Sequence, residues 1–103
     1  MSLIILEEAK VEINDLVAWY GERNLDAAER LSQLFEEAVC QIAANPGQFP
    51  LMEMWRNPGN VRRVRLTGYP IFVGYQQFAD DVFIFTVAHT SRRPGYWRSR
   101  LRK

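Results

Sequence analysis

Residues 61–88 read VRRVRLTGYPIFVGYQQFADDVFIFTVA, and this stretch decides the fold. Its first run, Val61 to Leu66, alternates apolar and basic residues with a period of two, as a half-buried strand does. The alternation places Arg63 and Arg65 on the face opposite the apolar side chains. A strand with one face in the core and its arginines facing outward is therefore predicted.

Two further strands follow in the same stretch. Ile71 to Phe78 places alternate apolar residues on two sides, and Val82 to Ala88 is almost entirely apolar. A continuous apolar run is typical of a central strand that is covered on both faces. Thr67-Gly-Tyr-Pro70 and Asp80-Asp81 supply the turns, since glycine, proline and aspartate favour turn conformations. The pattern predicts strands that pair antiparallel.

Upstream of these strands, the apolar spacing changes to that of helices. A short edge strand over Ser2 to Leu6 precedes a first helix that starts at Glu7 and ends near Gly21. Asn24 is suited to cap a second helix. That helix ends at Asn45-Pro46-Gly47, because the residue before proline avoids the α conformation. The expected core-facing residues of both helices are Ala9, Ile13, Leu16, Val17, Tyr20, Ala27, Leu31, Leu34, Phe35, Ala38 and Ile42.

The order of these elements defines the fold class. Two helices joined by a short link form an antiparallel hairpin, and residues 48–60 form an irregular connection that packs back in part. We predict an α+β fold of order β-α-α-β-β-β, in which an N-terminal helical hairpin packs on a small antiparallel sheet. A chain of 103 residues has the size of one ordinary domain, so a single domain over 1–103 is expected.

The overall net charge of +1 conceals two halves of opposite sign. Residues 1–55 contain ten acidic and three basic side chains, whereas residues 56–103 contain two acidic and ten basic ones. Two interpretations remain open: the halves pair as two faces of one fold, or the basic half binds a nucleic acid or an acidic partner. The second is favoured, because the basic residues cluster with aromatic ones.

The composition also indicates in which cellular compartment the chain is expected. No apolar run approaches the roughly 20 residues that span a bilayer, and Ser2 to Leu6 is too short for a signal peptide. The single cysteine, Cys40, cannot form an internal disulfide and is expected in the core or at its boundary. A reducing cytoplasm, without membrane contact, is the predicted location.

The last fifteen residues combine one histidine, six cationic side chains and two adjacent aromatic residues. Arg92 and Arg93 are candidates for binding phosphate, and their alternative role is in surface ion pairs. His89 either transfers a proton or hydrogen-bonds the backbone at the end of a strand. Tyr96 and Trp97 either stack on bases or anchor the chain into the core, and anchoring is expected for one of them.

Other basic residues extend this candidate surface. Arg63 and Arg65 join it if their strand neighbours the tail, and otherwise they lie on a solvated face of the sheet. Four basic residues near the end are expected to be mobile and to act electrostatically. These are Arg98, Arg100, Arg102 and Lys103. No metal and no other cofactor is expected, because the chain has one histidine and its lone cysteine lies on a helix.

In combination, four segments resemble the RelE/ParE superfamily of bacterial type II toxins, and in particular its ParE-like or plasmid-stabilisation group. They are Ile42-Ala-Ala-Asn-Pro46, Val61-Arg-Arg-Val-Arg-Leu66, Tyr69-Pro-Ile-Phe-Val-Gly-Tyr75 and Ala88-His-Thr-Ser-Arg-Arg-Pro-Gly-Tyr-Trp97. The last segment is the most specific, and the matching features span the whole chain. The resemblance implies a growth-inhibiting toxin that forms a hetero-oligomer with a cognate antitoxin, which neutralises it.

The resemblance also implies one of two targets. RelE-like members cut messenger RNA in the ribosome, whereas ParE-like members poison DNA gyrase and have no known catalytic step. The RelE-like pattern has an arginine three residues before the tyrosine that closes the second strand after the helices. Here that position is Phe72. Phe72 and the tail therefore favour the ParE-like branch, and the ribonuclease branch stays open.

The two branches give the candidate residues different roles. A ribonuclease would place Arg92 and Arg93 on the phosphate, with His89 or Tyr96 transferring protons. In a gyrase poison the same tail is a contact surface, and no residue is catalytic. The target-binding residues expected in either branch are Arg63, Arg65, Arg92, Arg93, Trp97, Arg98 and Arg100.

Two alternatives outside the active-toxin class also stay open. One is a non-toxic basic binding module, which the charge division supports equally well. The other is a degenerate toxin that acts only as an antitoxin partner and corepressor, as the loss at Phe72 suggests. For an active toxin, the antitoxin is expected to supply a partly helical, hydrophobic and charged peptide that buries Trp19 and Met52 or Met54.

Overall fold

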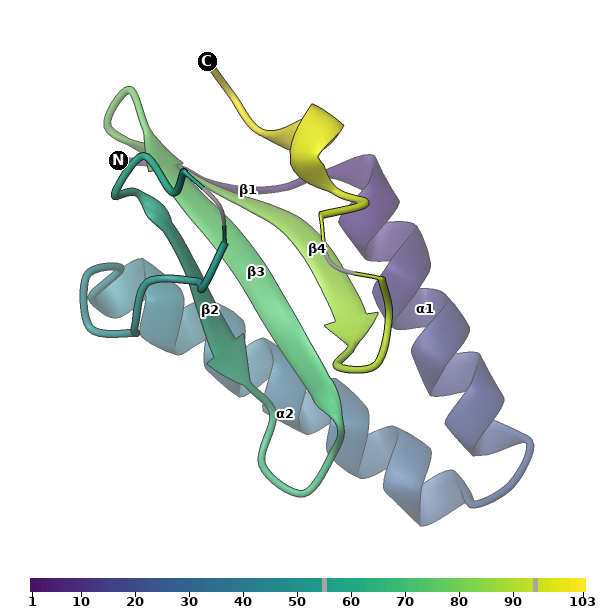
Figure 1. Ribbon diagram of the computed structural model, residues 1–103. Helices are drawn as coiled ribbons and strands as arrows, with labels where there is room; N and C mark the ends of the chain where they lie inside the picture. The colour runs from purple at the N-terminus through teal and green to yellow at the C-terminus, as the bar shows by residue number, and fades with distance from the viewer. Residues whose placement is uncertain (55, 94) are drawn as a thin grey trace.

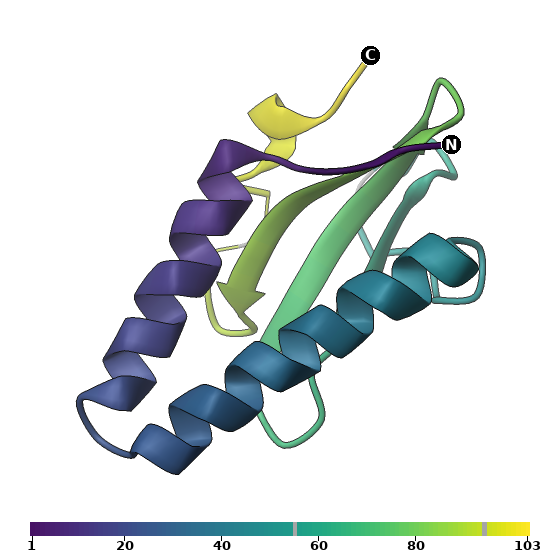
Figure 2. The same ribbon diagram turned by 180° about the vertical axis from the view of Figure 1, so that it is seen from behind.

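The computed structural model describes residues 1–54, 56–93 and 95–103. Two helices lie behind a four-stranded sheet, and Figures 1 and 2 show the arrangement from both sides. The predicted α+β fold with the order β-α-α-β-β-β is confirmed. In chain order the elements are β1 (Leu3–Ile5), α1 (Glu7–Gly21), α2 (Leu25–Ala44), β2 (Val61–Arg65), β3 (Ile71–Phe78), β4 (Asp81–His89) and the short 3₁₀ helix η1 (Arg98–Arg100).

The strands lie in the order β1-β4-β3-β2, so β4 is central as its apolar sequence predicts. β2, β3 and β4 pair antiparallel, whereas β1 pairs parallel to β4, with Leu3 opposite Val82. The sheet is therefore mixed rather than wholly antiparallel. The reason is connectivity, because β1 and β4 are separated by the helices and two strands instead of a hairpin turn.

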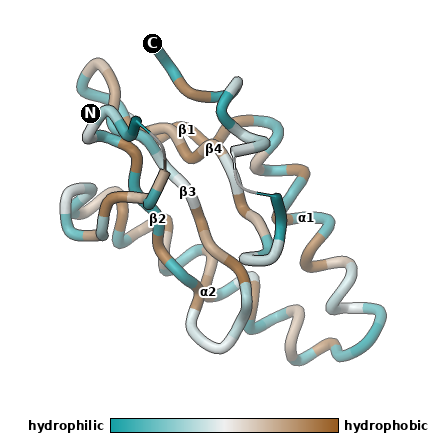
Figure 3. Tube along the Cα trace, in the orientation of Figure 1, coloured by the Kyte–Doolittle hydropathy of each residue, from teal (hydrophilic) through white to brown (hydrophobic). Residues whose placement is uncertain are grey.

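The helices begin and end close to the predicted residues. α1 ends at Gly21, and the Asn24 side chain accepts a hydrogen bond of 3.2 Å from the backbone N–H of Ala27, which caps α2. α2 ends at Ala44, directly before Asn45. The α1–α2 turn is hydrophilic, as its teal colour in Figure 3 shows.

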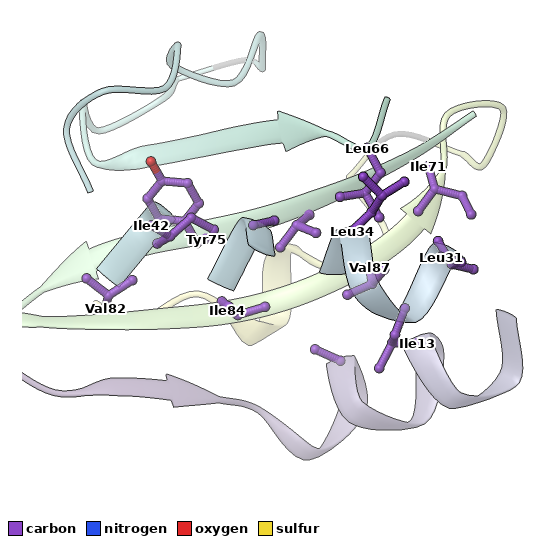
Figure 4. Close-up of a cluster of buried hydrophobic side chains, with 13 residues drawn as sticks. Ile13, Leu31, Leu34, Ile42, Leu66, Ile71, Tyr75, Val82, Ile84 and Val87 are labelled. Carbon is purple, nitrogen blue, oxygen red and sulfur yellow. The ribbon is translucent and has the colours of Figure 1, made fainter. Parts of the chain in front are cut away.

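The main core lies between the helices and one face of the sheet (Figure 4). Ile13 from α1 and Leu31, Leu34 and Ile42 from α2 point toward β3 and β4. On the sheet side they meet Ile71, Val73, Tyr75, Val82, Ile84 and Val87. The helical residues predicted to face the core lie in or against this cluster, with one exception. Ala28 rather than Ala27 is the buried alanine of the first α2 turn.

Cys40 also departs from expectation, because it is exposed on α2 rather than in the core or at its boundary. Among the described residues, no helix is long and apolar enough to cross a bilayer.

A second cluster covers the opposite face of the sheet and is built from Leu6, Met52, Val61, Phe72, Phe85, Ala88 and Trp97. The connection before β2 contributes to it, because the backbone N–H of Met52 donates to the carbonyl of Val61. The C-terminal segment, residues 95–103, supplies Trp97 and the flanking Tyr96 and Leu101. This face is therefore covered by irregular chain instead of a helix.

Candidate functional site

The C-terminal segment is fastened to the rest of the chain by the carboxylate of Glu12, on α1. The Glu12 side chain is 11% exposed. Its Oε1 accepts hydrogen bonds from the Thr86 hydroxyl at 3.0 Å, the Val87 backbone N–H at 3.2 Å and the Arg100 guanidinium at 2.8 Å. A carboxylate that leaves water needs such partners, since an unpaired buried charge is strongly destabilising.

The other carboxylate oxygen, Oε2, holds Tyr96 and Arg92. The Tyr96 hydroxyl donates to it at 2.8 Å, and the Arg92 guanidinium lies 3.6 Å away. The Arg92 guanidinium also lies 3.9 Å from the centroid of the Tyr96 ring, in a cation–π contact. Glu12 therefore joins helix α1, strand β4 and the tail in one hydrogen-bonded network.

Burial and this network both affect the pKa of Tyr96. Burial raises the pKa of the Tyr96 phenol above its ordinary value, and the hydrogen bond and charge of Glu12 raise it further. The Thr86 hydroxyl and the Arg92 charge oppose this rise. With its pKa raised, Tyr96 stays protonated near neutral pH and acts as a hydrogen-bond donor rather than a base.

Two of the four terminal basic residues are fixed, contrary to the expectation of mobility. The Arg100 side chain is 16% exposed and also donates to the Phe85 carbonyl at 3.0 Å. The Arg102 backbone donates to and accepts from the side chain of Gln76, at 2.8 Å and 3.0 Å. Arg98 and Lys103 are exposed. The segment thus follows a defined path across the sheet.

Of the two adjacent aromatic residues, Trp97 is the anchor. It is 4% exposed, and its ring centroid lies 4.9 Å from that of Phe85. Tyr96 is half-buried and is held by its hydroxyl. Anchoring was predicted for one of the pair, and Trp97 is that residue, while the Tyr96 hydroxyl is bound to Glu12.

A hollow of about 160 Å³ opens on the sheet face beside the tail, and we call it the basic hollow. It brings together five of the predicted site residues. Its lining is Met52, Glu53, Arg63, Phe72, Thr90, Arg92, Arg93, Tyr96 and Trp97. Arg63 was expected to join the candidate surface if its strand neighbours the tail, and in the structure Arg63 and tail residues line the same hollow. Arg65 lies instead beside the β2–β3 turn, and Arg98 lines a separate depression with Met54 and Arg102.

The arginines of this face differ in how far their charge is neutralised. Arg92 and Arg100 both pair with Glu12. Across residues 1–54, 56–93 and 95–103, by contrast, Arg63, Arg65 and Arg93 form no ion pair. The Arg63 guanidinium lies 5.6 Å from the Phe72 ring centroid instead. These three arginines are exposed and have no counter-ion within hydrogen-bonding range in the described part of the chain.

His89 is not part of the basic hollow. It ends β4, is exposed, and its Nδ1 lies 3.1 Å from the backbone N–H of Ser91 and 2.6 Å from the Ser91 hydroxyl. These contacts fit the role of a histidine that closes a strand end. The candidate ribonuclease residues are consequently divided, with Arg92, Arg93 and Tyr96 at the hollow and His89 outside it.

His89 lines a second, larger depression of about 430 Å³ between α1 and the end of β4, which we call the α1–β4 groove. The lining residues are Glu12, Asp15, Leu16, Trp19, Tyr20, Val87, Ala88, His89 and Arg92. Trp19 is 51% exposed, and the Arg23 guanidinium stacks on its ring at 3.7 Å. Of the two methionines named as alternatives beside Trp19, Met52 is buried at 5% exposure, whereas Met54 is only partly buried.

Glu12 is the site residue that sequence reasoning missed. No role was predicted for Glu12 from the sequence, because acidic residues near the start of a helix are common, where they complement the helix dipole. A signal was nevertheless present, because Glu12 follows Ala9 by three residues and precedes Leu16 by four, which places it at the border of the apolar face. No metal site accompanies it, since in the described residues no three His, Cys, Asp or Glu side chains are grouped to hold an ion.

Comparison with known proteins identifies the class. The family model "ParE toxin of type II toxin-antitoxin system, parDE" matches residues 3–94. The chain therefore belongs to the ParE toxin family, within the RelE/ParE superfamily of type II toxins. No curated protein gave a significant match.

The fold is also similar to that of a solved structure titled "Chromosomal ParDE TA system from P. aeruginosa". The TM-score is 0.71 at 18% sequence identity, and the match covers 86% of this chain and 95% of that chain. At this identity the likeness concerns the fold.

Proposed function

We propose that this ParE-family chain is a cytoplasmic toxin that inhibits growth by acting on DNA gyrase. The observation that carries this choice is the engagement of Tyr96 and Arg92 by Glu12. A ribonuclease needs free groups to transfer protons and to clamp phosphate. Here the tyrosine hydroxyl donates a hydrogen bond to a carboxylate, the arginine is paired and stacked, and the histidine lies outside the hollow.

The proposed contact surface is the basic hollow together with the unpaired arginines around it. Arg63 and Arg93 lie at the hollow, and Arg65 lies further along β2. Trp97 and Tyr96 support the surface from below, while the arginines meet the target. Unpaired exposed charges steer association and fix orientation, which suits a binding surface better than a catalytic centre.

The first test is pulse-labelling of DNA and protein synthesis within minutes of inducing the chain alone. We expect DNA synthesis to fall first, and purified chain to inhibit supercoiling by purified gyrase. If protein synthesis falls first, the ribosome is the target and the gyrase proposal is wrong. If neither falls, the chain is a binding module or a degenerate toxin.

Variants of the unpaired arginines locate the surface. The double variant Arg63→Ala/Arg93→Ala should need at least about tenfold more protein for half-maximal gyrase inhibition, since arginines are enriched among the few interface residues whose truncation costs most of the binding energy. Arg30→Ala is the matched control, because Arg30 is exposed on α2, on the other side of the sheet. Equal loss in both variants would argue against a contact role for the hollow.

We further propose that a cognate antitoxin neutralises the chain by filling the α1–β4 groove in a hetero-oligomer. The groove offers the exposed Trp19 ring beside the carboxylate of Asp15 on an acidic helix. An amphipathic segment with an apolar side chain for Trp19 and a basic one for Asp15 complements these features. Trp19→Ala should weaken antitoxin binding at least about tenfold, as loss of a central tryptophan usually does. Val11→Ala, exposed on the same helix but outside the groove, is the control.

A further inference from the structure

Glu12 links parts of the chain that the helix–sheet core alone would leave apart. Its partner Arg100 lies 88 positions later in the sequence, and its partner Tyr96 lies 84 positions later. Thr86 and Val87 place the carboxylate against the middle of β4. One side chain therefore sets the spacing between α1, β4 and the tail.

The main core does not depend on this carboxylate. That core is formed by α1, α2 and the other face of the sheet. The tail also has two anchors of its own, which are Trp97 on Phe85 and the pair of hydrogen bonds between Gln76 and Arg102. Loss of the Glu12 charge should therefore leave the fold intact and leave the end of the tail attached.

What Glu12 does control is the arrangement of side chains at the basic hollow. It fixes the Tyr96 hydroxyl and the Arg92 guanidinium, and both residues line the hollow. Arg92 stacks on Tyr96 and directly precedes Arg93, one of the unpaired arginines. The same carboxylate holds Arg100, so it keeps η1 close to β4.

We infer that Glu12 is the positioning residue of the target-binding surface: it acts through Tyr96, Arg92 and Arg100 and touches no target itself. This inference rests on the proposed gyrase function. The carboxylate orders three neighbouring side chains, and their order presents Arg93, which directly follows Arg92, in one geometry at the hollow that Arg63 also lines. Pre-ordered contacts bind more tightly, because less conformational entropy is lost on association.

The test compares Glu12→Gln with Glu8→Gln. Glutamine keeps the shape of glutamate but loses the charge, so Arg92 and Arg100 lose their counter-ion. Glu8 lies one turn earlier on α1, is exposed and, in the described residues, forms no ion pair. Each purified full-length variant is assayed for gyrase inhibition and for amide hydrogen exchange.

For Glu12→Gln we expect at least about tenfold weaker gyrase inhibition, with faster exchange in residues 95–101, because a broken buried ion pair releases the groups it held. Exchange in the main core strands β3 and β4 should stay as in the wild type, apart from the Val87 N–H that donates to Glu12. Glu8→Gln should match the wild type in both assays. A purely structural role would instead lower core protection and inhibition together, and that result would overturn the inference.

Tyr96→Phe gives a second, milder test if Glu12→Gln does not fold. It removes only the hydroxyl that reaches Glu12 and Thr86, and should weaken inhibition in the same direction by a smaller factor. If either variant folds and inhibits gyrase as fully as the wild type, Glu12 has no positioning role, whether or not the tail exchanges faster. The proposed gyrase function would survive that result. A wild-type chain that leaves gyrase active overturns the proposed function and this inference with it.

Discussion

At the scale of single residues, the sheet face under the tail leaves room for glycine alone at position 74. A Cβ atom there would lie 2.8 Å from the Thr86 methyl and 2.9 Å from the Phe85 ring. The pairing of β3 with β4 shifts register at Gly74, which brings Phe85 and Thr86 to the same side. This irregularity lets Thr86 meet Glu12 while Phe85 meets Trp97.

The substitution Gly74→Ala should lower the free energy of unfolding by roughly 1–3 kcal/mol, the usual cost of overpacking a filled core. Phe85 is 1% exposed and cannot swing away easily. Gly47→Ala is the control, because the added Cβ would meet no heavy atom closer than 3.8 Å. Urea unfolding measures both variants. Equal midpoints would show that the face is loosely packed.

Tyrosine ionisation adds a pH dependence at the same scale. Burial raises the pKa of both Tyr96 and Tyr75. A raised pKa in the folded state means that the associated stability is fully present below the unfolded value, about 10. It is lost as pH rises through the folded pKa. Unfolding free energy should therefore fall above about pH 10, and Tyr96→Phe should show a smaller fall. Identical pH profiles for the two proteins would contradict this.

At the scale of elements, α2 is the helix whose start is defined by a single side chain. Asn24 has extended backbone geometry and caps the N–H of Ala27. α1 lacks a comparable cap, since Leu6 makes no side-chain hydrogen bond there. Leu6 instead packs into the second cluster, so α1 is fixed by tertiary contact while α2 is fixed locally.

Removal of the α2 cap by Asn24→Ala should cost about 1 kcal/mol of unfolding free energy. Asn14→Ala offers the comparison, because Asn14 is exposed in the middle of α1, where alanine is the better helix former. The thermal unfolding midpoint should fall for Asn24→Ala. For Asn14→Ala it should rise or stay unchanged. A similar fall in both would indicate that the cap contributes little.

At the scale of the whole molecule, the sheet separates an acidic layer of helices from a face that carries arginines. The acidic helices cover one face, while Arg63, Arg92 and Arg93 surround the hollow on the other. Glu12 crosses this division, which explains why two arginines of the basic half are already neutralised. Glu12 is thus a point at which side chains of the acidic and the basic half form ion pairs.

This separation predicts a dependence of target inhibition on salt. Raising the ionic strength from about 0.01 M to about 0.1 M shortens the screening length from about 30 Å to about 10 Å, so inhibition by the wild type should weaken. Arg63→Ala/Arg93→Ala, which lacks two unpaired charges, should respond less. Measurement of half-maximal inhibition across this range decides the point, and parallel slopes would show that the contact is not electrostatic.

Sequence periodicity was sufficient for the elements and for the main core, because apolar spacing reports directly on which face is buried. Periodicity also identified the strand that carries Arg63, and residue type identified Asn24 as the cap of the second helix. The parallel pairing of β1 was not predictable, since short edge strands carry no signal of direction. The role of Glu12 was missed for a similar reason, because its partners come from distant parts of the chain.

The pairing of β1 with β4 has a consequence for biosynthesis. The strand made first, Leu3–Ile5, has no partner in the sheet until residues 82–84 have been translated. The tail residues that meet Glu12 are made later still. Contacts between segments so far apart in sequence form late. A nascent chain therefore cannot display the ordered basic hollow until the tail residues that bind Glu12 have been translated and have reached it.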